Sequence, residues 1–415
     1  MGRGSESNEM QSRNRNVARL TVGLCFLVAL LEGYDIQAAG VAAPGLARAL
    51  GLQSDALGLF FSASTIGMLI GASVGGWLAD RKGRKTVLLV AVALFGLFSL
   101  GTAWAASLPM LVMMRALTGL GMGAALPVLI TLAAESSPHG AARAVALMYA
   151  GTPIGGALAG VSSMAADRWQ TIFLWGGLLP LLVLPALALW LKENPAFAVK
   201  GKGRDNRSSG PASVTFAQGR WGLTLLLWCA FLASMLVFYL MLNWTPMLLA
   251  QKGLSRNLVG FFQATVNISG ALALLFLSPL LSGRFQIGMA TIVYGMIVAG
   301  LVMTAWVPPS LVLIIVAAMV LGAGLLMAQA VLYATGPRLY PAAVRATGTG
   351  AAVAVGRIGS VLGPVIAGAV LSVGVSPGLL LLLLVPVVVV AMIANLGVLT
   401  GVARRHPDGE AGQAS

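Results

Sequence analysis

Twelve stretches of about twenty predominantly apolar residues follow one another along this chain, and a stretch of that length lets a helix cross a membrane. They begin near residues 18, 57, 86, 109, 142, 171, 221, 257, 287, 310, 346 and 376. The chain is 58% hydrophobic and 9% charged, whereas a soluble domain is about 45–50% apolar and about 25% charged. We therefore predict an all-α integral membrane protein with twelve transmembrane helices.

The net charge of +14 could indicate a nucleic-acid partner, but the positions of the basic residues argue against one. If the N-terminus is cytoplasmic, twenty of the 26 Lys and Arg residues fall in cytoplasmic segments and four in external loops. The other two, Arg115 and Arg357, lie inside spans. This asymmetry follows the positive-inside rule and places both termini in the cytoplasm. Because topology accounts for the basic charge, no nucleic-acid partner is expected.

A polar stretch near the middle of the chain separates six spans from six, and its composition is that of a flexible linker. The two halves share short similarities at an offset of about 203 residues. Two six-helix repeats around a central site are a transporter architecture. We expect a monomer with a cytoplasmic tail over 1–17, a six-helix bundle over 18–191, a cytoplasmic linker over 192–220, a second six-helix bundle over 221–400 and a cytoplasmic tail over 401–415.

Glu32 and Asp35 are the two acidic residues inside the predicted spans, and both lie on the first span. A charge at the bilayer centre costs about 2.5–3.5 kcal/mol, so a carboxylate there indicates a functional site. We predict that these residues carry protons. At an offset of 204 residues they correspond to Leu236 and Tyr239, so proton chemistry is expected in the first half alone.

Asp35 and Arg115 are expected at similar depths. Each lies five or six residues inside the external end of its span, which is roughly 8 Å at a rise of about 1.5 Å per residue. The two side chains could therefore pair. The alternative is that the Arg115 side chain extends to the membrane surface.

Arg357 is the deepest basic residue of the second half. It lies twelve residues past Arg345, which is about 18 Å along a helix and too far for its side chain to reach the cytoplasmic surface. The second half contains no acid between residues 205 and 408. The partner of Arg357 is therefore an acid of the first span, backbone carbonyls or a bound anion. Because a guanidinium suits a carboxylate, we predict that it binds an anionic substrate, with a structural role as the alternative.

Other polar residues inside spans are candidates for substrate contact. Gln329 and Tyr333 are four residues apart, so they share a helix face. Asn243 and Trp244 end the seventh span, where a role at the membrane interface would equally explain the tryptophan. The predicted substrate-binding residues are Arg357, Arg115, Gln329, Tyr333, Tyr149, Trp244 and Asn243.

The loop between the second and third spans reads GGWLADRKGRK from Gly75. Gly76 would permit close helix packing and Gly83 a tight turn. The loop could serve only to set topology, but it also resembles the signature loop of the major facilitator superfamily, which forms a cytoplasmic gate. The corresponding loop of the second half lacks the acid, so the gate would be one-sided. The resemblance implies gating roles for Gly76, Asp80, Arg81, Gly83, Arg84, Glu135, Arg143, Arg338 and Arg345.

Within this superfamily the chain resembles the aromatic acid/proton symporters, and more closely their phenylpropionate branch. The residues that carry the resemblance are Glu32-Gly33-Tyr34-Asp35, Arg115, Glu135, Arg345 and Arg357, with Gly23 to Leu30 and Gln37 to Gly40. The resemblance implies the major facilitator fold and import of an aromatic carboxylic acid such as 3-(3-hydroxyphenyl)propionate. It implies transport across the bacterial cytoplasmic (inner) membrane, driven by the proton gradient without a cofactor.

Two other classes of function compete with aromatic acid import. A proton-coupled efflux antiporter of drugs or metabolites would use the same acids, and Pro153 to Gly156 partly resembles an antiporter motif. A membrane receptor or an intramembrane enzyme is the third possibility. No phosphate-binding loop, metal-ligand cluster or nucleophile–base pair is recognisable in the sequence, so neither an enzyme nor a metal site is expected.

Overall fold

The computed structural model describes the whole chain apart from residues 1, 138–139, 192–219, 278–285, 342–343 and 406–415. The described residues form helices and no strand, and they contain twelve helical segments long and apolar enough to span a membrane. Each segment begins within three residues of its predicted start. The prediction of twelve spans is confirmed. Hydrocarbon offers backbone N–H and C=O groups no hydrogen-bond partner, so an apolar stretch forms a helix, in which these groups bond to each other.

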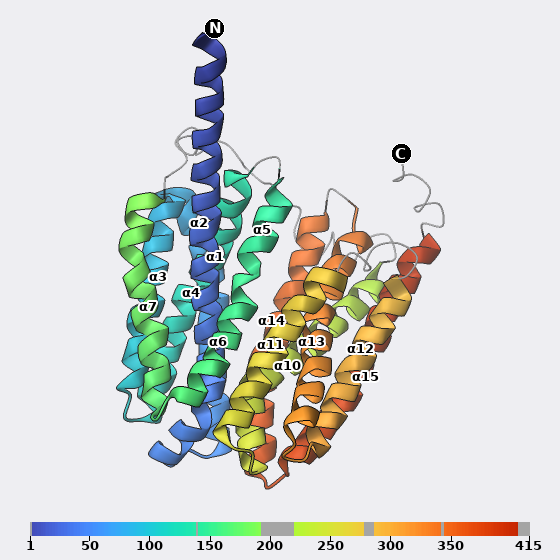
Figure 1. Ribbon diagram of the computed structural model, residues 1–415. Coiled ribbons are helices and arrows are strands. Elements are labelled where there is room, and N and C mark those ends of the chain that lie inside the picture. Colours follow the sequence, from blue (N-terminus) through green and yellow to red (C-terminus); the bar gives the residue numbers. More distant parts are fainter. Residues whose placement is uncertain (1, 138–139, 192–219, 278–285, 342–343, 406–415) are drawn as a thin grey trace. The chain divides into compact units, whose positions relative to one another are not determined.

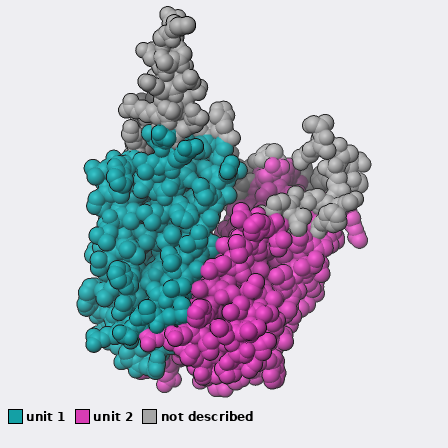
Figure 2. All heavy atoms as spheres, viewed as in Figure 1, with its two compact units in different colours: residues 1–50, 63–204 teal, residues 51–62, 205–415 magenta. Residues whose placement is uncertain are grey.

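The first of two compact units comprises residues 1–50 and 63–204 (Figure 2). Its helices are α1 (Gly2–Leu50), most of α2 (Ser54–Lys82), α3 (Arg84–Ala103), α4 (Leu108–Ser136), α5 (Ala141–Tyr149), α6 (Gly151–Ala165) and α7 (Trp169–Trp190) (Figure 1). α5 and α6 together form the fifth span. They separate at Ala150 because Pro153 has no N–H to donate to the carbonyl of Tyr149, four residues earlier.

The second unit comprises residues 51–62 and 205–415, and so includes the first turns of α2. Its other helices are α10 (Trp221–Gln251), α11 (Arg256–Leu277), α12 (Gln286–Trp306), α13 (Leu311–Leu339), α14 (Arg345–Ser372) and α15 (Pro377–Arg405). The predicted linker over 192–220 lies outside the described residues except for Arg220.

The two units pair their helices in the same way. In the first, the most extensive pairings join α1 to α6, α3 to α4 and α3 to α7, which are spans one with five, three with four and three with six. In the second, α10 packs on α14, α12 on α13 and α12 on α15, which are the equivalent pairs. The structure therefore confirms two pseudo-symmetric six-helix bundles.

Glycines allow these helices to approach closely. A Cβ atom on Gly119 or Gly123 of α4 would collide with the backbone of α2, whereas a Cβ on Gly121 would lie 2.7 Å from the backbone of α3. The alternating glycines thus thin two faces of α4, as their spacing predicts. In the second unit, Gly359 and Gly363 play the same part where α14 packs on the backbone of α10.

Candidate functional site

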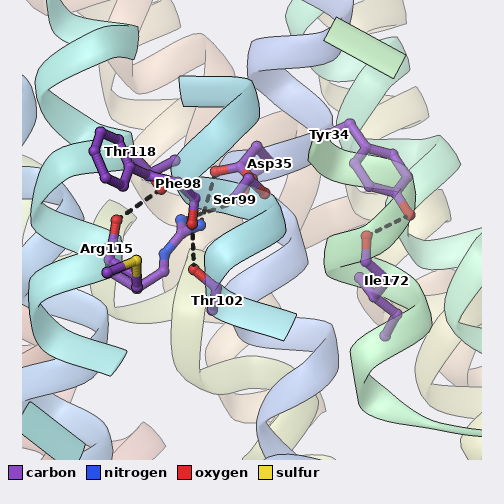
Figure 3. Close-up of polar contacts among 9 residues, drawn as sticks. Tyr34, Asp35, Phe98, Ser99, Thr102, Arg115, Thr118 and Ile172 are labelled. Carbon is purple, nitrogen blue, oxygen red and sulfur yellow. Dashed lines mark hydrogen bonds and ion pairs between the residues drawn. The ribbon is translucent and has the colours of Figure 1, made fainter. Parts of the chain in front are cut away.

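Asp35 and Arg115 form an ion pair inside the first unit (Figure 3). Nη1 of Arg115 lies 2.8 Å from Oδ2 of Asp35, and Nη2 donates to the Asp35 carbonyl oxygen at 3.4 Å. Both side chains are 0% exposed. The pairing expected from their matching depths is present. Extension of Arg115 to the membrane surface is wrong for this structure, because its guanidinium is held inside the bundle.

A third residue, Ser99 of α3, completes this centre. Its hydroxyl donates to Oδ1 of Asp35, and the side chain is fully buried. The aspartate is therefore held by α3 and by α4 at once (Figure 3). Sequence reasoning missed Ser99. Its signal was weak, because a lone serine in a span can equally bond to its own helix backbone.

Helix α7 also lies against the pair. The guanidinium carbon of Arg115 lies 5.6 Å from the centre of the Phe173 ring, within range of a cation–π interaction. One turn away on α7, Gly176 faces the aspartate: a Cβ there would lie 3.1 Å from Ser99 Oγ and 3.3 Å from Asp35 Oδ1. The glycine lets α7 approach the acid without covering it.

Tyr34 lies beside Asp35 in sequence but has a different role. Its hydroxyl donates to the Ile172 carbonyl at 3.3 Å and lies 2.9 Å from Ser162 Oγ (Figure 3 shows the former contact). These contacts tie α1 to α6 and α7. Glu32, the second predicted proton carrier, is 3% exposed and lies nearly one turn before Asp35 on the same helix.

In the second unit, Arg357 of α14 is half-buried and donates from Nη1 to the hydroxyl of Tyr239 on α10 at 3.1 Å. Tyr333 of α13 lies close enough to interact electrostatically with both residues, and its ring contacts the Phe231 ring edge-on at 5.6 Å between centroids. A phenol was not among the partners expected for Arg357 from the sequence. In the repeat, Tyr239 occupies the position of Asp35, so each unit places a polar residue of its first helix beside an arginine.

The remaining predicted substrate residues make contacts within their own units. Trp244 is fully buried, and its Nε1 donates to the carbonyl of Pro364 at 3.0 Å. Asn243 donates to the Tyr239 carbonyl at 2.8 Å. Gln329 lines a small cavity between α10, α12, α13 and α15 inside the second unit. Tyr149, at the end of α5, is exposed. Their roles in substrate binding stay predictions.

Three of the predicted gating residues, in the loop and at the end of α4, form a turn or an ion pair. Gly83 has a φ of 92° and makes the turn between α2 and α3, as predicted. Arg84 pairs with Glu135, which joins the start of α3 to the end of α4. The expected role of Gly76 in packing is wrong: a Cβ on Gly76 would meet nothing within 4 Å, whereas one on Gly75 would lie 2.5 Å from Ala124 of α4.

The other charged gating candidates lie at the surface of their own units. Arg81 stacks over the Trp77 ring at 4.0 Å, and Asp80 is exposed. Arg143 is exposed near the start of α5. In the second unit, Arg338 donates to Gln286. Arg345, which begins α14, is also exposed.

Two groups at helix ends of the second unit have displaced pKa values. Burial lowers the pKa of Lys252, whose Nζ donates to the carbonyls of Thr304 and Ala305 at 2.8 and 2.9 Å. Burial raises the pKa of Tyr340, whose hydroxyl donates to Thr224 at 3.2 Å. Both side chains fasten neighbouring helices together, and we assign them to the scaffold. The described residues contain no cluster of three or more potential metal ligands.

Comparison with known proteins identifies the family that has this architecture. Residues 25–364 match the model of the Major Facilitator Superfamily. The chain is 42% identical over 371 residues to the 3-(3-hydroxy-phenyl)propionate transporter of Escherichia coli, covering 89% of this chain and 91% of that protein. It is 34% identical to the gallate transporter of Pseudomonas putida over 407 residues, covering 89% and 90%. It is 33% identical to the 4-hydroxybenzoate transporter PcaK of the same species over 420 residues, covering 93% and 92%.

Solved structures agree on the fold. The nucleoside transporter NupG, as its D323A mutant, has a TM-score of 0.79 at 15% identity and covers 92% of this chain and 99% of its own. The D-xylose–proton symporter has a TM-score of 0.70 at 18% identity and covers 91% and 96%. Twelve spans, two matched bundles and relatives of near full length lead to one conclusion: the chain is a multi-pass membrane transporter, not an enzyme, and it belongs to the major facilitator superfamily.

Proposed function

We infer that this protein imports an aromatic carboxylic acid together with protons, by alternating access, across the bacterial cytoplasmic membrane. 3-(3-Hydroxyphenyl)propionate or a close analogue is the proposed substrate, both termini are cytoplasmic, the protein acts as a monomer, and the proton gradient is the sole driving force, with no cofactor. The observation that carries proton coupling is the fully buried Asp35–Arg115 pair.

A buried ion pair responds sharply to one proton. While Asp35 is ionised, its charge compensates the guanidinium, and the centre is neutral overall. A proton on Asp35 leaves Arg115 as an uncompensated buried cation, because a guanidinium does not deprotonate in proteins. Breaking a buried pair in this way costs about 3–5 kcal/mol, so the protonated centre favours a rearrangement that gives the guanidinium a new partner. This is the step through which proton binding drives a change of conformation.

Arg357 supports recognition of the substrate carboxylate. A guanidinium has five N–H donors in a planar fork, so Arg357 can donate to Tyr239 and to a substrate carboxylate at the same time. The Tyr239 hydroxyl fixes one side of the fork. Tyr333, 43% exposed and close to the same arginine, offers an aromatic face for the substrate ring.

The substrate class rests on the relatives. Three proteins that match nearly the whole chain at 33–42% identity are named as transporters of hydroxylated aromatic acids. The highest of these identities belongs to the hydroxyphenylpropionate transporter, which supports a phenylpropionate side chain rather than a benzoate.

The test is uptake of labelled 3-(3-hydroxyphenyl)propionate into proteoliposomes under an imposed inward proton gradient. We expect accumulation that a protonophore abolishes. Arg357→Gln should lose uptake, while Arg404→Gln, which removes an exposed arginine near the end of α15, should retain it. Uptake of benzoates but not phenylpropionates would change the substrate. Transport of cationic or neutral compounds toward the acidic side, with no acid uptake, would replace this function with efflux by antiport.

A further inference from the structure

The two carboxylate oxygens of Asp35 are held by chemically different partners (Figure 3). Oδ2 accepts from Nη1 of Arg115 at 2.8 Å, and Oδ1 accepts from the Ser99 hydroxyl. All three side chains are 0% exposed, so bulk water does not compete for these hydrogen bonds. The two oxygens therefore differ in what happens when a proton arrives.

A proton on either oxygen turns that oxygen from an acceptor into a donor. On Oδ2 the new O–H would face Arg115, which has N–H donors and no acceptor. On Oδ1 it would face Ser99, whose oxygen has two acceptor positions besides its own O–H. The serine can therefore reverse the hydrogen bond, and the arginine cannot.

We propose that Asp35 carries the transported proton on Oδ1, and that Ser99 is the positioning residue that donates to the ionised acid and accepts from the protonated one. This inference rests on the proposed proton coupling. The proton comes from a hydronium ion of the external water, which leaves as water, and the new O–H bond neutralises Asp35. The net charge of the pair rises from zero to one. The Ser99 hydrogen turns to a backbone carbonyl of the preceding turn, as Thr102 does with Phe98 at 2.9 Å.

The surroundings of Asp35 leave few other groups to hold this proton. Of the helices packed on α1, neither α6 nor α7 contains a charged residue. Helix α4 supplies Arg115, and its acid, Glu135, lies twenty residues further along. The basic residues of α3 are at its start, Arg84 and Lys85, and α5 carries Arg143 and Tyr149.

On α1 itself, the two titratable neighbours of Asp35 are Glu32 and Tyr34. The Tyr34 hydroxyl contacts Ser162 Oγ and the Ile172 carbonyl instead of the carboxylate. Figure 3 shows the contact with Ile172. Glu32 is buried nearly one turn away. Ser99 thus supplies the neutral hydroxyl group that contacts the Asp35 carboxylate directly.

Gly176 adds an independent observation on the Oδ1 side. The position its missing Cβ would occupy is 3.1 Å from Ser99 Oγ and 3.3 Å from Asp35 Oδ1, tighter than ordinary van der Waals contact. Any larger residue would press on both oxygens. The glycine leaves the Ser99–Oδ1 hydrogen bond room to lengthen slightly when its direction reverses.

Infrared difference spectroscopy on the purified full-length protein tests the inference without transport. A pH step should produce a protonated-carboxyl band that Asp35→Asn removes. In Ser99→Ala the band should move to higher frequency, because the neutral acid loses its hydrogen-bond acceptor. Ser99→Thr, which keeps a hydroxyl, should restore it. Thr102→Val removes a buried hydroxyl of the same helix, which donates to the backbone carbonyl of Phe98, and it should leave the band unchanged.

Transport gives the second readout. A hydrogen bond to a charged group is about twice as strong as one between neutral groups. Loss of the Ser99 hydroxyl therefore destabilises the ionised form of Asp35 more than the protonated form. We expect half-maximal uptake of Ser99→Ala at an external pH higher by about one unit. Ser99→Thr and Thr102→Val should keep the wild-type midpoint. A serine that only supports packing would lower the rate at every pH without moving this midpoint.

The results of these experiments distinguish a failure of the Ser99 inference from a failure of the proposed proton coupling. An unmoved band and an unmoved midpoint in Ser99→Ala would overturn the inference, as would equal shifts in Ser99→Ala and Ser99→Thr. If a protonophore does not affect wild-type uptake, the proposed proton coupling fails. In that case the infrared band still decides whether Asp35 donates to Ser99.

Discussion

Removing one member of the Asp35–Arg115 pair should have an effect that depends strongly on which member is removed. In Asp35→Leu a guanidinium stays buried inside the first unit without the acid that pairs with it, and it has no means of losing its charge. In Arg115→Met a carboxyl group stays buried, but it can become neutral by binding a proton. The double variant Asp35→Leu/Arg115→Met buries neither charge.

The magnitudes follow from complete burial. Both side chains are 0% exposed, so solvent screening does not reduce the penalty. Leaving one charge of such a pair uncompensated costs about 3–5 kcal/mol, whereas apolar replacement of both partners is often neutral or stabilising. For a unit of this size we expect Asp35→Leu to lower the apparent Tm by about 10 °C. The double variant should unfold within a few degrees of the wild type.

Arg115→Met should cost less than Asp35→Leu, because a buried carboxyl can be neutralised by a proton and a buried guanidinium cannot.

The assay is thermal unfolding in detergent, followed by tryptophan fluorescence, for the three variants and the wild type. Size-exclusion profiles recorded at 4 °C confirm that each sample starts folded. Equal losses in both single variants would refute the reasoning. So would a double variant no more stable than Asp35→Leu, because the penalty would then not arise from an unpaired charge.

Single substitutions test three other contacts. Tyr239→Phe removes the hydroxyl that holds Arg357 and should raise the KM for the acid several-fold with little change in maximal rate, measured as uptake against substrate concentration. Gly176→Ala should slow uptake at least tenfold while the protein stays folded by size exclusion, because its methyl presses on Asp35; Gly222→Ala, where a Cβ meets nothing within 4 Å, is the matched control. Glu135→Gln breaks a partly exposed ion pair worth about 0.2–1 kcal/mol, so a Tm change above a few degrees would contradict the assignment.

Much of the fold could be predicted because the membrane simplifies the relation between sequence and structure. An apolar stretch of about twenty residues has to become a helix there, and its length sets its span. The same rule gave the depths of Asp35 and Arg115 and hence their pairing. Gating roles for Arg84 and for Glu135 came from resemblance alone, and their ion pair is a finding of the structure.

Some contacts were beyond reach of the sequence because they depend on how helices rotate against one another. Gly75 and Gly76 are neighbours in the same motif, yet Gly75 is the one that faces α4. A rotation of one residue, about 100°, decides which glycine packs. Trp244 was expected at the membrane interface or the substrate, but its helix turns the indole inward to Pro364.

The amino-acid sequence by itself determined the twelve spans, the two halves and the burial of one acid and one arginine at the same depth, since these depend on the free energy of moving each residue into hydrocarbon. The tertiary structure decided what touches Asp35. Ser99 and Gly176 act through a hydroxyl and through a missing side chain, and neither carries a transfer free energy that distinguishes its position. Only the packing of α3 and α7 against α1 places them at the carboxylate.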